Sequence, residues 1–150
     1  MSPDRYIKPP DGSPATNQDD PNWSHEERAI VVYLRTNTSH TVDPGGATLR
    51  GRLYDFTLDK RTDPRPADGK SLAKPWVDSQ TMLHAAKRSV AKGGQAPCLI
   101  FDIRGTRIDF TEAQNGVKKI AGWYGKQGRY PGKLNYVIVI GDGFYIEEMI

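Results

Sequence analysis

The spacing of apolar and polar positions divides the chain into a polar beginning and a folded remainder. Residues 1–22 contain five prolines together with Asp, Gly, Ser and Asn, and they have almost no apolar side chains. Such a segment buries too little apolar surface to offset the entropy lost on ordering. The pattern therefore predicts a flexible leader or linker over residues 1–22 and one folded domain over residues 23–150.

Three later segments have the signals of capped amphipathic helices. Ser24 and Glu27 form the pattern of a capping box, and Trp23 is placed to pack against the first turn. The apolar run that follows suits a helix or a strand, and the cap favours a helix. Residues 78–92 and 111–124 carry apolar side chains at helical spacing, and each begins with a residue that can cap a helix.

Apolar runs between these helices predict the strands. Residues 53–59 alternate between apolar and polar, which is typical of a half-buried strand. Residues 97–103, 134–140 and 144–149 have the composition of further strands, whereas the proline-punctuated residues 60–75 have that of a polar loop. Helices that alternate with strands predict an α/β fold, with a central mixed sheet flanked by helices.

Length and cysteine content narrow the class of protein. At 150 residues the chain fits one domain, and its apolar runs are too short to cross a bilayer. The first ten residues lack the apolar core of a signal peptide, so an exported form would travel as part of something longer. Cys98 is the single cysteine and lies in an apolar run. This excludes an intrachain disulfide and a multi-cysteine zinc site, and it favours a buried thiol.

Acids on the alternating segment are candidate metal ligands. Asp55 and Asp59 fall on the polar side of residues 53–59, where two carboxylates can hold a divalent metal, although an ordinary solvated strand has the same pattern. Asp68 and Lys70 follow with acid–x–Lys spacing. An Asp followed by acid–x–Lys is the skeleton of metal-dependent nucleases, in which the lysine is the electrostatic partner of the attacking water. That spacing is common by chance and here falls in the predicted loop, so these two residues stay outside the candidate set.

Glu26 and three histidines complete the titratable candidates. Glu27 has the capping role, which leaves Glu26 free on the first turn, either as a metal ligand or as an acid favoured by the helix N-terminus. His25, His40 and His84 lack metal-ligand spacing. An acid–base ribonuclease could still combine His40 or His84 with a lysine and a tyrosine.

A basic and aromatic segment is the strongest indication of a nucleic-acid partner. The formal net charge of +3 and the pI of about 9.0 permit such a partner without requiring one. Residues 123–133 interleave cations, which neutralise phosphates, with aromatic rings, which stack on unpaired bases. The same residues also suit a helix end followed by a soluble loop. The candidate contacts are Lys126, Arg129, Tyr130 and Lys133.

Three segments share their pattern with one known family. The first is the opening helix with Asn22 and Glu26, and the second is the basic run 88–96, which leads into an apolar strand. The third is the ending 136–146 with its Gly-Asp-Gly turn. Together they resemble the C-terminal toxin domains of contact-dependent growth inhibition proteins of the CdiA type, over most of residues 22–150. The resemblance implies a restriction-endonuclease-like fold of the PD-(D/E)xK kind.

The family cleaves nucleic acid, often tRNA, with a helix glutamate, two aspartates and a lysine around a divalent metal. The resemblance assigns the glutamate to Glu26, the second aspartate to Asp55 and the lysine, by approximate position, to Lys87. No acid stands near Gly46, where the family has its first aspartate in a Pro-Asp pair. The nearest acid is Asp43, in the reversed Asp-Pro order, so either Asp43 or Asp59 substitutes, or the metal site is lost and the domain works in another way.

The implied activity is that of a metal-dependent ribonuclease toxin domain from an interbacterial competition system, with tRNA as a candidate substrate. Glu26, Asp55 and Asp59 would hold Mg²⁺ or Zn²⁺, and Lys87 would stabilise the phosphate in the transition state. The resemblance also implies a cognate immunity protein bound to the basic face, secretion within a larger protein and action in the cytoplasm of a target cell. We expect a monomer.

Two other interpretations remain open at the level of the sequence. One is a metal-independent ribonuclease toxin that uses histidine, lysine and tyrosine side chains. The other is a non-catalytic basic module that binds RNA or a protein, which the missing acid near Gly46 keeps in view.

Overall fold

The computed structural model describes residues 16–47, 51, 53–92 and 96–150. Residues 1–15 of the predicted leader and residues 93–95 of the basic run lie outside these ranges. The elements follow one another as α1 (His25–Asn37), β1 (Val42–Pro44), β2 (Phe56–Leu58), β3 (Arg65–Ser71), α2 (Ser79–Ala91), β4 (Cys98–Asp102), α3 (Phe110–Tyr124), β5 (Tyr136–Gly141) and β6 (Phe144–Met149).

The strands form one mixed sheet whose spatial order follows the chain, β1-β2-β3-β4-β5-β6. The first three strands pair antiparallel, β3, β4 and β5 pair parallel, and β6 returns antiparallel to β5. Helix α2 connects β3 to β4 and helix α3 connects β4 to β5, as parallel neighbours require a crossover. This confirms the predicted α/β class with a central mixed sheet and flanking helices.

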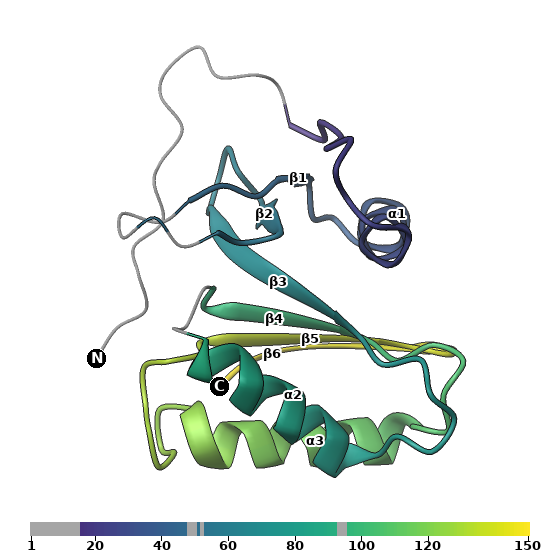
Figure 1. Cartoon of the computed structure of the whole chain (residues 1–150), viewed down its shortest axis with the longest axis vertical. Helices are drawn as coiled ribbons and strands as arrows, with labels where there is room; N and C mark the ends of the chain where they lie inside the picture. The colour runs from purple at the N-terminus through teal and green to yellow at the C-terminus, as the bar shows by residue number, and fades with distance from the viewer. Residues whose placement is uncertain (1–15, 48–50, 52, 93–95) are drawn as a thin grey trace.

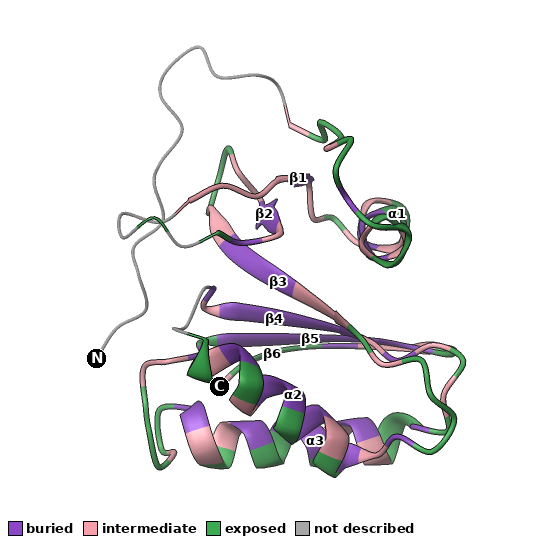
Figure 2. Cartoon of the chain, in the orientation of Figure 1, coloured by how far each residue is buried: buried purple, intermediate pink, exposed green. Residues whose placement is uncertain are grey.

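Helices cover both faces of the sheet. Helices α2 and α3 lie side by side along one face, whereas α1 lies on the other, next to β1 and β3 (Figure 1). The alternation within β4 follows from this: Leu99 and Phe101 pack against α2 and α3, and Cys98 and Ile100 belong to the cluster around α1. Both sets are buried, so β4 and β5 have the continuous apolar composition of doubly covered strands (Figure 2).

The predicted helices are confirmed, and one begins earlier than expected. Ser24 and Glu27 form the capping box of α1, with Ser24 Oγ accepting the Glu27 amide. Asp78 caps α2 as predicted. The third helix is capped by Asp109 rather than by Thr111, because the Asp109 carboxylate accepts the amide of Glu112 three residues later.

Two expectations for the strands are wrong. Residues 60–75 are not a loop throughout, since they contain the seven-residue strand β3, which is paired on both sides. The predicted strand 53–59 shortens to β2, and it has no open polar face: Thr57 is 3% exposed, and its hydroxyl donates to the carbonyl of Pro44 at 3.0 Å. Leu53 is 72% exposed.

Part of the predicted leader belongs to the folded unit. The Gln18 amide donates to Asp43 Oδ1 at 3.0 Å, and the Asn17 side chain accepts the amide of Val42 at 2.9 Å. These bonds attach residues 17 and 18 to β1. No helix among the described residues combines the length and the apolar character that a membrane span needs.

Candidate functional site

Two aspartates meet where β2 and β3 pair. Asp55 immediately precedes β2, Asp68 lies in the middle of β3, and the register places Phe56 opposite Ala67. Asp68 Oδ1 accepts the Asp55 amide at 3.1 Å, and Asp55 Oδ2 accepts the Gly69 amide at 2.9 Å. The antiparallel pairing and these reciprocal bonds hold the two carboxylates in one place although they are 13 residues apart.

Burial and mutual repulsion make this pair costly to ionise. Burial raises the pKa of Asp68 to about 6, and the nearby charge of Asp55 acts in the same direction. Burial also raises the pKa of Asp55; the Gly69 amide opposes this, and the Glu27 carboxylate adds to it. Lys70, two residues after Asp68 on β3, lowers both values. The charges of Asp55, Asp68, Glu27 and Lys70 therefore lie close enough to influence one another.

One oxygen of this group lacks a hydrogen-bond partner. Asp68 is 4% exposed, and its Oδ2 is a buried atom with no partner among the described residues. Buried polar atoms in native proteins almost always have a partner, and exceptions concentrate where a site has another role. Asp43 Oδ2 on β1 is a second such atom. The unpaired oxygen of Asp68 is an available ligand beside a second carboxylate.

Helix α1 brings Glu27 to the same place. Its side chain accepts the Ser24 amide at 2.8 Å, and it also lies close enough to Asp55 to raise the pKa of that carboxyl. Glu27 and Asp55 together line a cavity of about 350 Å³. The other lining residues are Asp20, Asn22, Trp23, Gly45, Gly46, Leu53 and Tyr54.

Gly69 permits this close approach of α1 to β3. A Cβ atom at position 69 would lie 2.9 Å from Ile30 Cδ1 and 2.9 Å from Phe56 Cε2, closer than such atoms normally come. The amide of the same residue binds Asp55. A side chain between Asp68 and Lys70 would therefore push the helix that carries Glu27 away from the two aspartates.

The donor set suits magnesium better than zinc. Across the part of the chain that the structure describes, no three His, Cys, Asp or Glu side chains are grouped as a ready-made metal site. Catalytic zinc takes three protein ligands, whereas Mg²⁺ is usually bound by one or two carboxylates together with waters and substrate phosphates. Asp55 and Asp68, with the unpaired Oδ2 of the latter, fit that second pattern.

The structure does not bring the residues selected from the sequence together. Asp55 is in the candidate site, but Glu26 is exposed on α1, and Glu27 is the glutamate that lies beside Asp55. Asp59 follows β2 at the end opposite Asp55, about 13 Å along an extended chain. There its carboxylate binds His40 Nδ1 at 2.8 Å and the amide of Thr41.

Lys87 lies on the other face of the sheet from α1. Its ammonium is 3.7 Å from the centroid of the ring of Trp123, a residue of α3. Within the described part of the chain, the structure therefore gives no direct contact between Lys87 and either Glu26 or Asp55. The helical lysine is held in the α2–α3 layer by its contact with Trp123.

The sequence contains signals for three site residues that were not among the predicted ones: Asp68, Lys70 and Glu27. Asp68 and Lys70 have the acid–x–Lys spacing, but that spacing is common by chance, and β3 resembles a loop in composition. Glu27 lies on the inward stripe of α1, since it stands three residues before Ile30 and seven before Leu34, both of which are buried. That periodicity is the signal that separates Glu27 from Glu26.

The predicted nucleic-acid contacts lie around the end of α3. Lys126, Arg129 and Tyr130 are exposed, and Lys133 is partly buried. The Tyr130 ring stacks on Trp123 with 5.6 Å between centroids. The segment is therefore neither a free aromatic platform nor a wholly inward-packed loop.

His40 is held between two carboxylates. Its Nδ1 binds Asp59 at 2.8 Å, and its Nε2 binds Glu147 at 2.5 Å. The bonds raise the pKa of the imidazole, although burial acts against them. With both ring nitrogens engaged, His40 links β2 to β6 and has no nitrogen left for a substrate. His84 is exposed on α2 beside Gln80.

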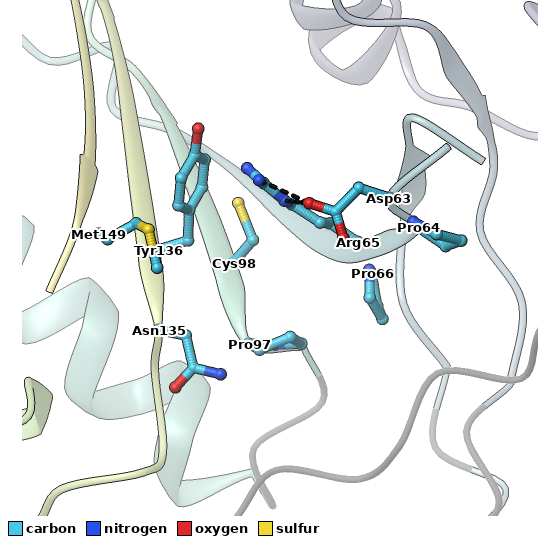
Figure 3. Close-up of a pocket in the computed structure, with 9 residues that line it drawn as sticks. All are labelled: Asp63, Pro64, Arg65, Pro66, Pro97, Cys98, Asn135, Tyr136 and Met149. Atoms are coloured by element: carbon cyan, nitrogen blue, oxygen red, sulfur yellow. Dashed lines mark hydrogen bonds and ion pairs between the residues drawn. The ribbon is translucent and has the colours of Figure 1, made fainter. Parts of the chain in front are cut away.

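A separate pocket of about 330 Å³ lies at the amino ends of the parallel strands (Figure 3). Its lining comprises Asp63, Pro64, Arg65, Pro66, Pro97, Cys98, Asn135, Tyr136 and Met149. The Arg65 guanidinium stacks over Tyr136 and binds Asp63 at 2.8 Å. The positive charge of Arg65 and the negative charge of Asp63 are therefore paired with each other. The Cys98 thiol is fully buried, as expected, and burial raises its pKa. This pocket contains none of the candidate acids.

Comparison with known proteins gives a likeness of fold. No protein-family model matches the chain, and no curated protein matches it. Among solved structures, the chain is similar to one in the CdiA-CT/CdiI toxin and immunity complex from Burkholderia pseudomallei, with a TM-score of 0.58 and 16% identity. The match covers 91% of this chain and 98% of that one. The α/β fold is thus shared with a chain of a toxin–immunity complex over nearly the full length of both.

Proposed function

We propose that this chain is a toxin domain that hydrolyses phosphodiester bonds in RNA with the help of a divalent metal. The observation that carries the proposal is the pairing of Asp55 with Asp68, with Lys70 on the same strand. An aspartate followed by acid–x–Lys is the skeleton of metal-dependent nucleases. In this fold Asp55, which immediately precedes β2, is hydrogen-bonded to the neighbouring strand β3, which carries Asp68 and Lys70.

Asp55 and Asp68 would hold Mg²⁺, because together they offer two carboxylates and one buried unpaired oxygen. When bound, the ion supplies positive charge that lowers the pKa of a coordinated water and neutralises the phosphate. Its charge would also favour the ionised form of Asp68, whose pKa is otherwise about 6.

Lys70 and Glu27 have supporting roles in this arrangement. The Lys70 ammonium supplies a positive charge for the scissile phosphate where negative charge develops, as pre-placed cations do in hydrolytic sites. Glu27 lines the cavity beside Asp55 and keeps a carboxylate near the attacking side, where it can accept a proton. In this proposal Lys70 stabilises the charge that develops on the phosphate, and Glu27 accepts a proton.

The wider biological context is part of the proposal. The solved neighbour comes from a complex of a toxin with its immunity protein, which supports a role for this chain in interbacterial competition. We accordingly propose a cognate immunity protein as its partner, delivery as part of a larger secreted protein, tRNA as a substrate and the cytoplasm of a target cell as the place of action.

Cleavage assays on the full chain test the proposal. Incubation with bulk tRNA should give products with Mg²⁺ and none with EDTA. Asp55→Asn, Asp68→Asn and Lys70→Met should each reduce the rate about 100-fold or more, because each removes a group that stabilises developing charge. A DNA substrate in parallel shows whether the activity is confined to RNA.

The two neighbouring glutamates provide a matched control. Glu27→Gln preserves the capping box, which accepts Gln at this position, and should lose activity, whereas Glu26→Gln should retain it. EDTA-resistant cleavage that disappears on His40→Ala or His84→Ala would instead support an acid–base ribonuclease. Binding without turnover under every condition would leave a non-catalytic module.

A further inference from the structure

Positive charge is concentrated on α2, on α3 after its acidic first turn, and on the loop that follows α3. Residues 79–92 and 113–135 contain eight of the chain's 21 Lys and Arg and none of its 18 Asp and Glu. These are Lys87, Arg88, Lys92, Lys118, Lys119, Lys126, Arg129 and Lys133. Since the net charge of the whole chain is only +3, the remainder of the molecule is net acidic.

The seam between the two helices holds several of these cations together. Lys87 from α2 lies 3.7 Å from the centre of the Trp123 ring, and Arg129, just after α3, lies 5.3 Å from the same centre. Tyr130 stacks on this indole and is 49% exposed. Cation–π contacts with Trp123 hold the positive charges of Lys87 and Arg129 in fixed positions on this layer.

These charges have no internal counter-ions. None of the eight cations forms an ion pair with an acid within the described ranges, and Lys119 binds only the amide of Gln80, at 3.4 Å. By contrast, Arg35, Arg65 and Arg104 elsewhere in the chain each pair with an aspartate. Repulsion among unpaired like charges disfavours the free protein, and an anionic partner relieves it.

We infer that the α2–α3 layer is a binding surface for the phosphate backbone of a nucleic acid. The sheet lies between α2–α3 and the helix that carries Glu27 (Figure 1). Asp68 and Lys70, however, pair with Leu99 and Phe101, which pack against α2 and α3. The inference extends the proposed function and does not depend on it.

The composition of the layer favours a nucleic acid over an acidic protein. Protein interfaces rely on apolar and aromatic anchors at their centre. Of the large apolar side chains exposed among the described residues, only Tyr130 lies in these two segments. Cations spread over two helices and one loop match a chain of phosphates, for which each contact is electrostatic.

Salt-dependent binding by the full chain tests this inference. The probe is a fluorescein-labelled hairpin of 2′-O-methyl RNA, measured by anisotropy in EDTA so that cleavage does not interfere. Arg88→Gln, Lys118→Gln and Lys126→Gln are combined, because all three side chains are exposed and Gln is tolerated in helices. If each contacts a phosphate, the slope of log K against log salt falls by roughly 2 to 3, and affinity at low salt falls at least about tenfold.

A second triple variant removes the same charge elsewhere. Lys60→Gln, Arg61→Gln and Arg107→Gln should leave the slope within one unit of the wild-type value. Equal losses in both variants, or an unchanged slope in the first, would overturn the inference. The inference would also be overturned if polyglutamate displaced the hairpin as effectively as unlabelled RNA at the same total charge. That result would identify a surface for an acidic protein. If the wild-type chain binds the hairpin but does not cleave tRNA, that result counts against the hydrolytic proposal alone.

Discussion

Asp68 is the residue at which stability and the proposed chemistry conflict. It is 4% exposed, it lies beside Asp55, and one of its oxygens has no partner among the described residues. A hydrophobic or amide side chain there would avoid the cost of burying charge. Retaining a carboxylate at such a position makes sense if a cation compensates it, and charges of this kind cluster at functional sites.

The pH dependence of stability should reveal this cost. The pKa of Asp68 rises from 3.8 to about 6 on folding, so the folded protein binds more protons in that interval and stability falls as pH rises through it. A shift of about two units corresponds to roughly 3 kcal/mol. Asp68→Asn should therefore raise the free energy of unfolding at pH 7 by about 2 to 3 kcal/mol, and flatten its decline between pH 4 and 6, as measured by urea denaturation without metal. An equal decline in wild type and variant would show that Asp68 ionises at no cost.

At the scale of elements, β3 explains why the site is hard to find from sequence. Its residues, Arg65–Ser71, include two glycine or proline positions and a single apolar side chain, Ala67. Nothing in this composition indicates a strand. The strand exists because β2 pairs with it on one side and β4 on the other, and such pairing cannot be deduced from local propensity. The helices and the three apolar strands, by contrast, follow from caps and periodicity alone.

The packing of α1 on β3 gives a direct test at this scale. Gly69→Ala places a methyl group 2.9 Å from both Ile30 and Phe56, so the free energy of unfolding should fall by about 1 to 3 kcal/mol. Cleavage should fall further than folding explains, because α1 also carries Glu27. Gly122→Ala is the matched control: no heavy atom lies within 4 Å of its added Cβ, and an alanine in α3 should stabilise by up to about 1 kcal/mol. Urea titrations of both variants decide the matter, and an unaffected Gly69→Ala protein would mean that α1 is not packed as described.

The register of α1 also decides which glutamate reaches the site. Sequence reasoning gave Glu27 a purely capping role and left Glu26 as the candidate ligand. In the structure one carboxylate does both: Glu27 accepts the Ser24 amide and also faces Asp55. A residue that caps a helix can therefore also belong to a functional site when it lies on the inward side of that helix. The fold class could be predicted; the choice among acids one residue apart needed the helix orientation.

At the scale of the whole molecule, positive charge gathers in one layer. The candidate acids lie around β2, β3 and α1, and eight cations that form no ion pair among the described residues lie on α2, α3 and the loop that follows. Composition alone concealed this, because opposite charges cancel in the net value of +3. Only the topology, which places α2 and α3 on one face, turns scattered lysines into one surface.

Localising a divalent ion tests the central claim most directly. Mn²⁺, a paramagnetic substitute for Mg²⁺, can be titrated in substoichiometric amounts into the ¹⁵N-labelled full chain while its amide resonances are followed. The amides of Asp55, Asp68 and Gly69 should broaden first, excess Mg²⁺ should reverse the effect, and Asp68→Asn should abolish it. Broadening that begins instead at Glu26, at Asp59 or evenly over the acidic surface, and that persists in Asp68→Asn, would contradict a metal site between β2 and β3.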